Sequence, residues 1–494
     1  MTEPSTTSAG GTGVAAQDGS RPYDVDYPDA LKELMRQGWL DAPLAVSRRA
    51  SADHHARRRD AVAAAFAGEF LVIPAGRDHV RSNDTFYPFR PGSDFVWLTG
   101  ESEPGSTVVI DPNGAATLYV RAHTNRDTDE FYRNAAFGEL WVGRRRSLAE
   151  RTEELGVPTA PLSSLPETLA GLAPARTRVL RGLDATVDSA VLPYDSAEQG
   201  VRDRELAQTL SELRLPKDPW EIAQIQEAVD ATVRGFEDVA RILPADRVVS
   251  ERLIEGVFGL RARHDGNGVG YSSIVGAGTH ATTLHWIRND GVTAPGALLL
   301  LDMGVEGSAL YSADVTRTIP VSGRFTPLQR EIYEIVFSAQ QAGLAALVPG
   351  VRYEDVALAC NRVLAEGLSD LKLLPCSVDE SVSKENMSHR RWTLHGFGHM
   401  LGLDVHDCAG ARKELYRDGT VEENYVITVE PGLYFQSDDE MVPEELRGIG
   451  IRIEDDVVVT ASGARNLSGA LPRSPDEVET WLATQREAGP RLPG

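Results

Sequence analysis

The sequence predicts two domains, an α/β domain with a mixed sheet followed by an α+β domain with an antiparallel sheet. Three observations support this fold class. The chain has 494 residues, which is too many for one ordinary hydrophobic core. Strand-like runs alternate with helical stretches up to about residue 213, as expected for an α/β domain. Beyond that point, amphipathic helices precede and separate strands that carry acidic residues, which indicates an antiparallel sheet wrapped by helices.

The N-terminal α/β domain is predicted to span residues 51 to 215. Residues 1 to 50 form an extension before it, and the first twenty of these are small, polar and Gly-rich, so disorder is expected there. The domain begins with a helical pattern at residues 51 to 66. Strand-like runs bounded by Gly, Pro or Asn follow, with the sequences EFLVIPAG, DFVWLTG, STVVIDP and ATLYVRA. Helical stretches around 148 to 155 and 163 to 172 and a strand at RVLRGL complete the alternation.

The C-terminal α+β domain is predicted to span residues 216 to 494. Asp218 is a good N-cap, Pro219 occupies the first helical turn, and Glu221 completes the spacing of a capping box. Apolar residues then recur at steps of three and four, which indicates an amphipathic helix. These residues are Ile222, Ile225, Val229, Val233 and Phe236. Further helices are predicted at 251 to 266 and 328 to 350.

Composition excludes several classes of partner. The chain has 73 acidic and 50 basic residues, and its net charge of −23 repels nucleic acids and anionic membranes. No apolar run approaches the roughly 18 residues needed to span a membrane. The first thirty residues lack a basic end followed by an apolar stretch, so no signal peptide is expected. Three cysteines without metal-ligand spacing favour reduced thiols in a cytoplasmic protein.

Four carboxylates and one imidazole, each in a strand-like or turn-like context, are candidate metal ligands: Asp302, Asp314, His399, Glu430 and Glu454. A buried strand does not end on an ionised carboxylate without a partner, because desolvating the charge costs several kcal/mol. Oxygen-rich ligands with one imidazole suit hard or borderline divalent ions such as Mn, Mg, Co or Zn. Four negative charges would be balanced by two divalent ions, so the residues predict a two-metal hydrolase site.

Each of these residues also has a simpler explanation when taken alone. Asp302 and Asp314 could be a turn aspartate and a solvated strand aspartate, although Gly304 and Gly307 between them favour a hairpin that makes the carboxylates face each other. Glu430 and Glu454 could be solvated strand residues. If none of the five candidates bound metal, five residues of suitable type would have to occur in suitable contexts by coincidence, which favours the metal site.

Three histidines lie within residues 395 to 406. In HGFGH, the two glycines disfavour a helix, so His395 and His399 are expected to face the same way in an extended chain. His406 follows in the same stretch. A lone histidine is more often a core residue than a functional one, but three in one segment favour function.

The C-terminal half resembles the creatinase-like "pita-bread" metallopeptidases, and most closely the Xaa-Pro aminopeptidases (aminopeptidase P). The resemblance covers roughly residues 216 to 470 and rests on YSSIVGAG, LLLLDMGVEGSALYSADVTRT, HGFGHMLGLDVHD, VITVEPGLYF and RGIGIRIEDDVVVT. In the N-terminal half, RSNDTFYPFRPGSDFVWLTG resembles the corresponding segment of bacterial aminopeptidases P. The implied catalytic domain has a pita-bread fold with a curved antiparallel sheet.

The resemblance also implies roles for the candidate residues. The five candidate ligands would hold a dinuclear centre, usually of Mn²⁺, with Co²⁺ or Zn²⁺ as alternatives. His285, His395 and His406 match active-site histidines that are not ligands, and Arg452 matches an arginine of the family motif, interpreted here as substrate-binding. Glu430 would shuttle a proton for a hydroxide that attacks the carbonyl of the N-terminal residue.

The implied function is removal of the N-terminal residue from peptides with proline at the second position. The first alternative is a Xaa-Pro dipeptidase (prolidase), whose C-terminal motifs are similar. A non-catalytic peptide-binding module on the same scaffold is the second alternative.

Trp141, in ELWVGRRRS, predicts an assembly contact. Aromatic and Arg residues are enriched at the cores of interfaces. In the resembling family the N-terminal domain of one subunit can wall the active site of a neighbour, and Trp141 matches such a tryptophan. A homo-oligomer, either a dimer or a tetramer, is therefore expected. The alternative is that Trp141 packs in the core of its own domain.

Overall fold

A computed structural model describes residues 27–40, 42–83, 85–191 and 197–493. The extension predicted to be disordered at residues 1 to 20 lies outside these ranges. Contacts divide the chain into two compact units with the boundary between Leu206 and Ala207. The first unit has a mixed sheet and the second is an α+β unit with antiparallel pairing, so the predicted fold class is confirmed.

The first unit is built on a five-stranded sheet with the order β6-β5-β4-β1-β7. The β1–β4 and β4–β5 pairs are antiparallel, whereas β1–β7 and β5–β6 are parallel. The strands of this sheet are β1 (Phe70–Pro74), β4 (Thr107–Ile110), β5 (Ala116–Val120), β6 (Thr159–Pro161) and β7 (Thr177–Val179), and a separate hairpin joins β2 (Val80–Ser82) and β3 (Thr85–Phe86).

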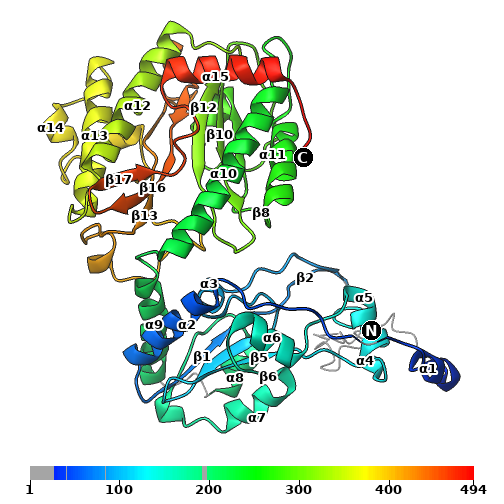
Figure 1. Ribbon diagram of the computed structural model, residues 1–494. Helices are drawn as coiled ribbons and strands as arrows, with labels where there is room; N and C mark the ends of the chain where they lie inside the picture. Colours follow the sequence, from blue (N-terminus) through cyan, green and yellow to red (C-terminus); the bar gives the residue numbers. More distant parts are fainter. Residues whose placement is uncertain (1–26, 41, 84, 192–196, 494) are drawn as a thin grey trace, which may run out of the picture. The chain divides into compact units, whose positions relative to one another are not determined.

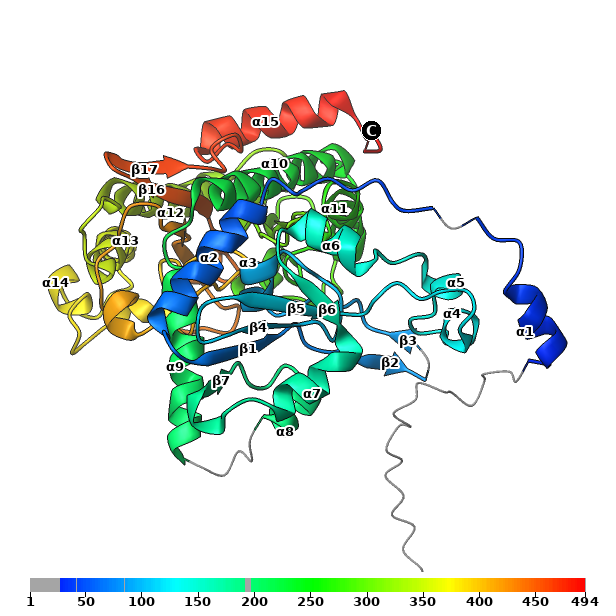
Figure 2. The same cartoon turned by 60° about the horizontal axis from the view of Figure 1, so that its bottom comes forward.

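Helices cover both faces of this sheet. Figure 2 shows α2 and α6 on one face and α7 and α8 on the other. On the second face, Leu165, Leu169 and Val187 pack against Val72 and Val179 of the strands. The helices are α1 (Asp29–Met35), α2 (Ala52–Ala65), α3 (Ser93–Thr99), α4 (Asp129–Arg133), α5 (Glu139–Val142), α6 (Leu148–Leu155), α7 (Leu165–Ala170) and α8 (Ala185–Ala190), and α9 (Ala197–Leu213) contains the boundary.

The segment DFVWLTG forms helix α3, so its assignment as a strand is wrong. Phe95 and Leu98 are fully buried and Trp97 is nearly so, because the helix is enclosed on more than one side. Such a helix has no polar face, and a short apolar run of this kind cannot be told from a buried strand by periodicity. Gly100 ends the helix in the left-handed region with φ 67°.

The second unit wraps helices around antiparallel strands (Figure 1). All strand pairs described there are antiparallel. The strands are β8 (Gly268–Val269), β9 (Ile274–Ala277), β10 (Leu298–Met303), β11 (Val305–Glu306), β12 (Val315–Pro320), β13 (Val426–Val429), β14 (Gly432–Tyr434), β15 (Gly450–Arg452), β16 (Asp455–Thr460) and β17 (Gly463–Asn466). The helices are α10 (Pro219–Ile242), α11 (Glu251–Asp265), α12 (Pro327–Ala346), α13 (Tyr353–Asp370), α14 (Val378–Ser381) and α15 (Pro475–Ala488).

Helix α10 begins as the sequence predicts. The Asp218 side chain accepts hydrogen bonds from Trp220 N and Glu221 N, and the Glu221 side chain accepts one from Asp218 N. This reciprocal pair is a capping box. Farther along the helix, Phe236 is fully buried in the main hydrophobic core, which also contains Leu299 of β10. The core therefore fixes the strands that carry the candidate ligands.

None of the helices in the described ranges is long and apolar enough to cross a membrane.

Candidate metal centre

Glu430 and Glu454 lie opposite each other between two antiparallel ladders. The β13–β16 ladder ends with Val429 opposite Asp455, and the register continues without a shift into the β14–β15 ladder. The two glutamates occupy the short gap between the ladders. This gap places two carboxylates that are distant in sequence on facing positions.

Asp302 and Asp314 reach the same site from a second strand pair. Asp302 lies opposite Thr316 in the β10–β12 ladder. Asp314 precedes Thr316 by two residues, so the two aspartates share a face and are diagonal neighbours. The predicted proximity is confirmed, although the pairing is diagonal and not direct. The Tyr271 hydroxyl oxygen lies 2.6 Å from Asp302 Oδ1 and 2.6 Å from Asp314 Oδ1, which holds the two carboxylates together.

His399 presents one ring nitrogen to these carboxylates. Its Nδ1 lies 3.0 Å from the carbonyl oxygen of Met400, so that nitrogen is the hydrogen-bond donor. Its Nε2 lies 3.3 Å from Asp314 Oδ2 and 3.7 Å from Glu430 Oε1. A backbone contact of this kind fixes the tautomer that leaves Nε2 available to a metal. The segment HGFGH is not helical, as predicted.

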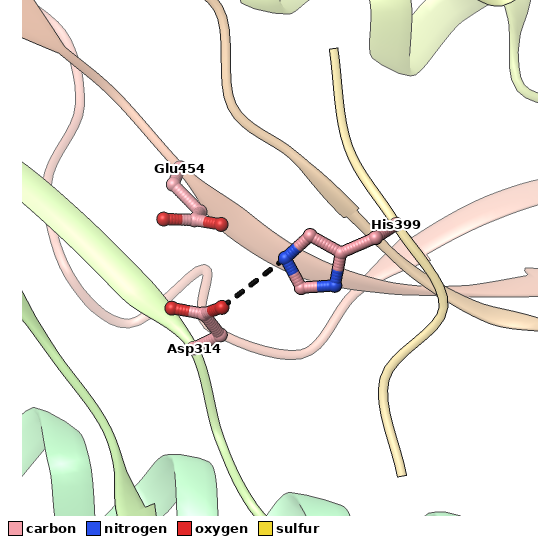
Figure 3. Close-up of side chains that lie close together, drawn as sticks. All are labelled: Asp314, His399 and Glu454. Atoms are coloured by element: carbon pink, nitrogen blue, oxygen red, sulfur yellow. Dashed lines mark ion pairs between the residues drawn. The ribbon is translucent and has the colours of Figure 1, made fainter. Parts of the chain in front are cut away.

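Three of the candidate ligands are within metal-binding reach of one another. One ligand atom from each of Asp314, His399 and Glu454 lies within 4.8 Å of the others. In Figure 3 these three side chains point toward a common space, and a dashed line joins Asp314 to His399. Asp302 and Glu430 extend this group along a pocket of about 670 Å³. That pocket is lined by all nine candidate residues of the second unit: His285, Asp302, Asp314, His395, His399, His406, Glu430, Arg452 and Glu454.

The buried carboxylates repel one another. Burial raises the pKa of Glu430 to about 7, even though His399 and Arg452 act in the opposite direction. Burial and the neighbouring Asp314, Glu430 and Asp302 raise the pKa of Glu454 well above its ordinary value. Burial also raises the pKa of Asp302. Such a cluster requires positive charge between its members.

The histidine environment supports the same conclusion. Burial lowers the pKa of His399, but its hydrogen bond to Asp314 and the charge of Glu430 outweigh burial and raise the pKa to about 9. The imidazole thus sits where the carboxylates attract a cation. Four carboxylates and one imidazole are a donor set that divalent ions of the Mn, Co and Zn type accept. The residues therefore fit a metal centre.

Arg452 donates to one of the candidate ligands and to two neighbouring hydroxyls. Its guanidinium donates to Asp302 Oδ2 at 2.6 Å, to the Tyr434 hydroxyl at 2.9 Å and to Thr316 Oγ1 at 3.1 Å. Arg452 is only 3% exposed. The side chain thus orients Asp302, and its expected contact with substrate stays a prediction.

The histidines that are not predicted ligands line the same pocket. His395 Nε2 lies 2.8 Å from the Tyr434 hydroxyl oxygen, and its Nδ1 lies 3.4 Å from Glu430 Oε2. Burial and the charge of Arg452 lower the pKa of His395 to about 3, so its ring is neutral at physiological pH. The ring of His406 meets the ring of His399 edge to face, with centroids 4.4 Å apart. Burial, followed by the charge of His399, lowers the pKa of His406.

Several residues that complete the site were not singled out from the sequence. Tyr271 bridges two aspartates, Tyr434 joins His395 to Arg452, and Thr316 donates a 2.7 Å hydrogen bond to Glu454 Oε2. All three lie inside or beside the segments that carry the family resemblance, and that position is the only signal that could have identified them.

Trp141 belongs to the first unit. It lies at the end of α5, and its indole N–H donates to the carbonyl oxygen of Tyr132 at 2.9 Å. The side chain is 57% exposed, and its neighbours Leu140 and Val142 are also more than half exposed. Trp141 is therefore not packed in the core of its own unit.

Comparisons with known proteins agree with this site. Residues 223–461 match the family model of metallopeptidase family M24, and residues 55–180 match that of the aminopeptidase P N-terminal domain. The chain is 52% identical over 464 residues to Xaa-Pro aminopeptidase 1 of Streptomyces coelicolor, covering 92% of this chain and 93% of that protein.

Solved structures give the same assignment. The structure of aminopeptidase P from E. coli with the inhibitor Pro-Leu matches with a TM-score of 0.78 and 31% identity, covering 90% of this chain and all of that one. A zinc-substituted form of the E. coli enzyme in complex with product matches with the same TM-score and coverage. The chain belongs to the Xaa-Pro aminopeptidase family of metallopeptidases.

Proposed function

We propose that this protein is a metal-dependent exopeptidase that releases the N-terminal residue from peptides with proline at the second position. The observation that carries the proposal is the convergence of Asp302, Asp314, His399, Glu430 and Glu454 on one pocket, in a chain of this family. The enzyme uses divalent metal, as a metallopeptidase with this cluster of ligands does.

We further propose that the five residues hold two ions, with Mn²⁺ as the physiological metal and Co²⁺ or Zn²⁺ as substitutes. Two divalent ions would offset the four carboxylate charges, and the facing carboxylates of Glu430 and Glu454 would help to hold them. The metal would supply activated water and a polarised substrate carbonyl. Within that setting, Glu430 holds the proton that leaves the attacking water.

The other pocket residues act on the substrate. His395 and His406 would hydrogen-bond the developing oxyanion or the peptide backbone, because both line the pocket beside the ligands. His285 would contact the proline side. A Xaa-Pro bond has no N–H, so the enzyme must hold the substrate through such contacts and not through a backbone amide.

Assembly and location are proposals of the same kind. The exposed Leu140–Val142 segment supports a dimer or tetramer in which Trp141 helps close a pocket on a neighbouring copy. Three free cysteines, of which Cys360 and Cys408 are buried, support a reducing cytoplasmic location. We also propose residues 51–215 and 216–494 as the two functional domains, because the capping box at Asp218 begins the first helix of the metal-binding part.

The test is elemental analysis combined with kinetics on a matched pair of peptides, Xaa-Pro and Xaa-Pro-Yaa. We expect bound divalent metal, loss of turnover with a chelator, recovery with Mn²⁺, and cleavage of the tripeptide. Strict preference for the dipeptide would assign the chain to the prolidases. A protein that binds no metal and cleaves neither peptide would indicate a non-catalytic binding module.

A further inference from the structure

One wall of the pocket is a loop between β9 and β10. Leu284, His285 and Ile287 of this loop line the pocket. The loop is not part of a sheet or a long helix, so its position depends on contacts with the surrounding unit. What holds it determines the shape of the pocket on the side where His285 is proposed to meet proline.

A single buried carboxylate accepts hydrogen bonds from several parts of the loop. Glu251, the first residue of α11, is 0% exposed. Four N–H groups donate to its two oxygens. Oε1 accepts from Ala277 N at 2.9 Å and from His280 Nδ1 at 2.8 Å. Oε2 accepts from Trp286 Nε1 at 2.8 Å and from Gly291 N at 2.7 Å. A buried carboxylate is tolerated only when it is satisfied in this way. Glu251 therefore joins the end of β9 to both ends of the loop.

The hydrogen bond between Trp286 and Glu251 determines how the loop is placed at the pocket. It lies between His285 and Ile287, which both line the pocket, whereas its own indole N–H is bonded to Glu251. The Trp286 ring is 8% exposed and stacks on His280 with centroids 3.8 Å apart and an interplanar angle of 24°. Fixing the indole fixes the backbone on either side of it, and so fixes the two pocket-lining side chains.

The far end of the loop is also anchored. Asn289 has φ 46°, a left-handed conformation, and its side chain accepts from Val275 N and donates to the carbonyl oxygen of Ser273. A Cβ at Gly291 would lie 2.5 Å from the His280 ring and 2.9 Å from Glu251 Oε1, so a side chain there would displace both partners of the His280–Glu251 hydrogen bond. The loop is thus fitted closely around Glu251.

We infer that Glu251 is a positioning residue for the proline side of the pocket. It acts through Trp286, which sets the placement of His285 and Ile287, and it touches neither metal ligands nor substrate. The inference rests on the proposed function for the identity of the substrate. A purely structural role for Glu251 would change stability but leave the binding of proline-containing ligands intact.

The test uses Trp286→Phe and Glu251→Gln with Glu255→Gln as the matched control. Trp286→Phe keeps a planar aromatic side chain, although a smaller one, and removes the indole N–H donor. Glu251→Gln keeps the size but turns an amide NH₂ toward N–H groups that need an acceptor. Glu255 is half-buried one turn along the same helix and does not line the pocket. Each variant is measured for metal content, for calorimetric binding of the dipeptide Pro-Leu, and for kcat and KM on a Xaa-Pro-Yaa tripeptide.

We expect Trp286→Phe and Glu251→Gln to retain metal and to bind Pro-Leu about tenfold more weakly, because His285 and Ile287 lose the placement that the Trp286–Glu251 hydrogen bond gives them. KM for the tripeptide should rise by a similar factor while kcat falls less, because the contact with proline exists before the transition state. Glu255→Gln should match the wild type in every measurement.

Two results would overturn the inference. The first is that folded, metal-loaded Trp286→Phe binds Pro-Leu as tightly as the wild type does. If Glu251→Gln fails to fold, the affinity of Trp286→Phe for Pro-Leu is by itself the test of the inference. The second is an equal loss in Glu255→Gln. Failure of the proposed function is distinguishable, because a wild-type protein that does not cleave the tripeptide contradicts that function whatever the variants do.

Discussion

Glu430 is the candidate carboxylate ligand that lies between two histidines, the candidate ligand His399 and the pocket residue His395. One of its oxygens lies 3.7 Å from His399 Nε2 and the other lies 3.4 Å from His395 Nδ1. It can therefore hold metal and exchange a proton at the same place. Burial raises the pKa of Glu430 to about 7, so a nearby cation is needed to keep this carboxylate ionised at neutral pH.

We expect Glu430→Ala to abolish nearly all turnover and to weaken metal binding, because one change removes both a ligand and the proton carrier. Metal content measured by mass spectrometry and kcat on a Xaa-Pro-Yaa tripeptide check this. An active Glu430→Ala protein with full metal would contradict both roles.

His406→Ala is expected to separate chemistry from metal binding. His406 lines the pocket and packs on the ring of His399, but it is not a predicted ligand. Loss of one transition-state hydrogen bond should lower kcat about a hundredfold or more, at about 3 kcal/mol, while the metal content stays constant. His264→Ala, on an exposed part of α11, is the control. A metal-depleted His406→Ala protein would show that the residue holds the ligand shell and not the substrate.

The residues that could be predicted from the sequence are those whose chemistry conflicts with their context. Asp302 interrupts an otherwise apolar and fully buried strand, and an ionised group in that place needs an explanation. Tyr434 and Glu251 produce no such conflict. A tyrosine is ordinary in a strand, and Glu251 looks like a first-turn acid favoured by the helix dipole. Their roles depend on partners brought together only by the tertiary fold.

At the scale of elements, the segment that leads into α10 is tied to the HGFGH-to-His406 stretch by buried charges. Lys217 and Asp407 are each about 2% exposed, and Nζ lies 2.9 Å from Asp407 Oδ2. Arg214 also pairs with Asp407, and Lys217 Nζ donates to the carbonyl oxygen of Arg214 at 2.6 Å. Asp407 directly follows His406, so this ion cluster anchors the backbone beside a catalytic candidate.

Lys217→Met is expected to destabilise the protein by about 3–5 kcal/mol, the cost of leaving one member of a buried ion pair uncompensated. Thermal or urea unfolding measures the change. Lys384→Met is the matched control, because Lys384 pairs with Glu354 on the surface, where such pairs contribute about 0–1 kcal/mol. Equal stability of the two variants would mean that the buried pair adds nothing.

The same cluster predicts a pH dependence. Burial raises the pKa of Asp407, but Arg214 and Lys217 outweigh it and hold the pKa far below its ordinary value. A carboxylate with a depressed pKa stabilises the fold above its unfolded pKa of about 3.9, and this stability is lost as the pH falls toward the folded value. The stability gap between wild type and Lys217→Met should therefore be widest near neutral pH and shrink below about pH 4. A gap that stays constant down to pH 3 would contradict this assignment.

Three helices show which features made an element predictable and which did not. Helix α10 has a capping box and a periodic apolar face, and its predicted start is correct. Helix α3 is buried along most of its length, so its sequence lacks the period of 3.6 and resembles that of a buried strand. Helix α13 begins at Tyr353 without a side-chain cap, so its sequence carries no start signal from which it could be predicted.

At the scale of the whole molecule, the exposed apolar side chains of α5 favour assembly. The net charge of −23 makes copies of the chain repel each other over most of the surface, so a contact requires a local attraction that outweighs this repulsion. Leu140, Trp141 and Val142 supply apolar area, whereas the basic run from Arg144 to Arg146 is paired with glutamates of the same unit. Exposed aromatic residues of this kind are enriched at interface cores.

We therefore expect the wild-type protein to be a dimer or tetramer by light scattering, and Trp141→Ala to weaken the assembly. If Trp141 helps close a neighbouring pocket, the variant should also change selectivity between short and long Xaa-Pro peptides while its fold and metal content stay intact. Leu253→Ala removes an equally exposed apolar side chain from α11 and should change neither property. A monomeric wild-type protein with full activity would contradict the assembly, because the pocket would then be complete within one chain. An oligomer unaffected by Trp141→Ala would place the interface on another surface.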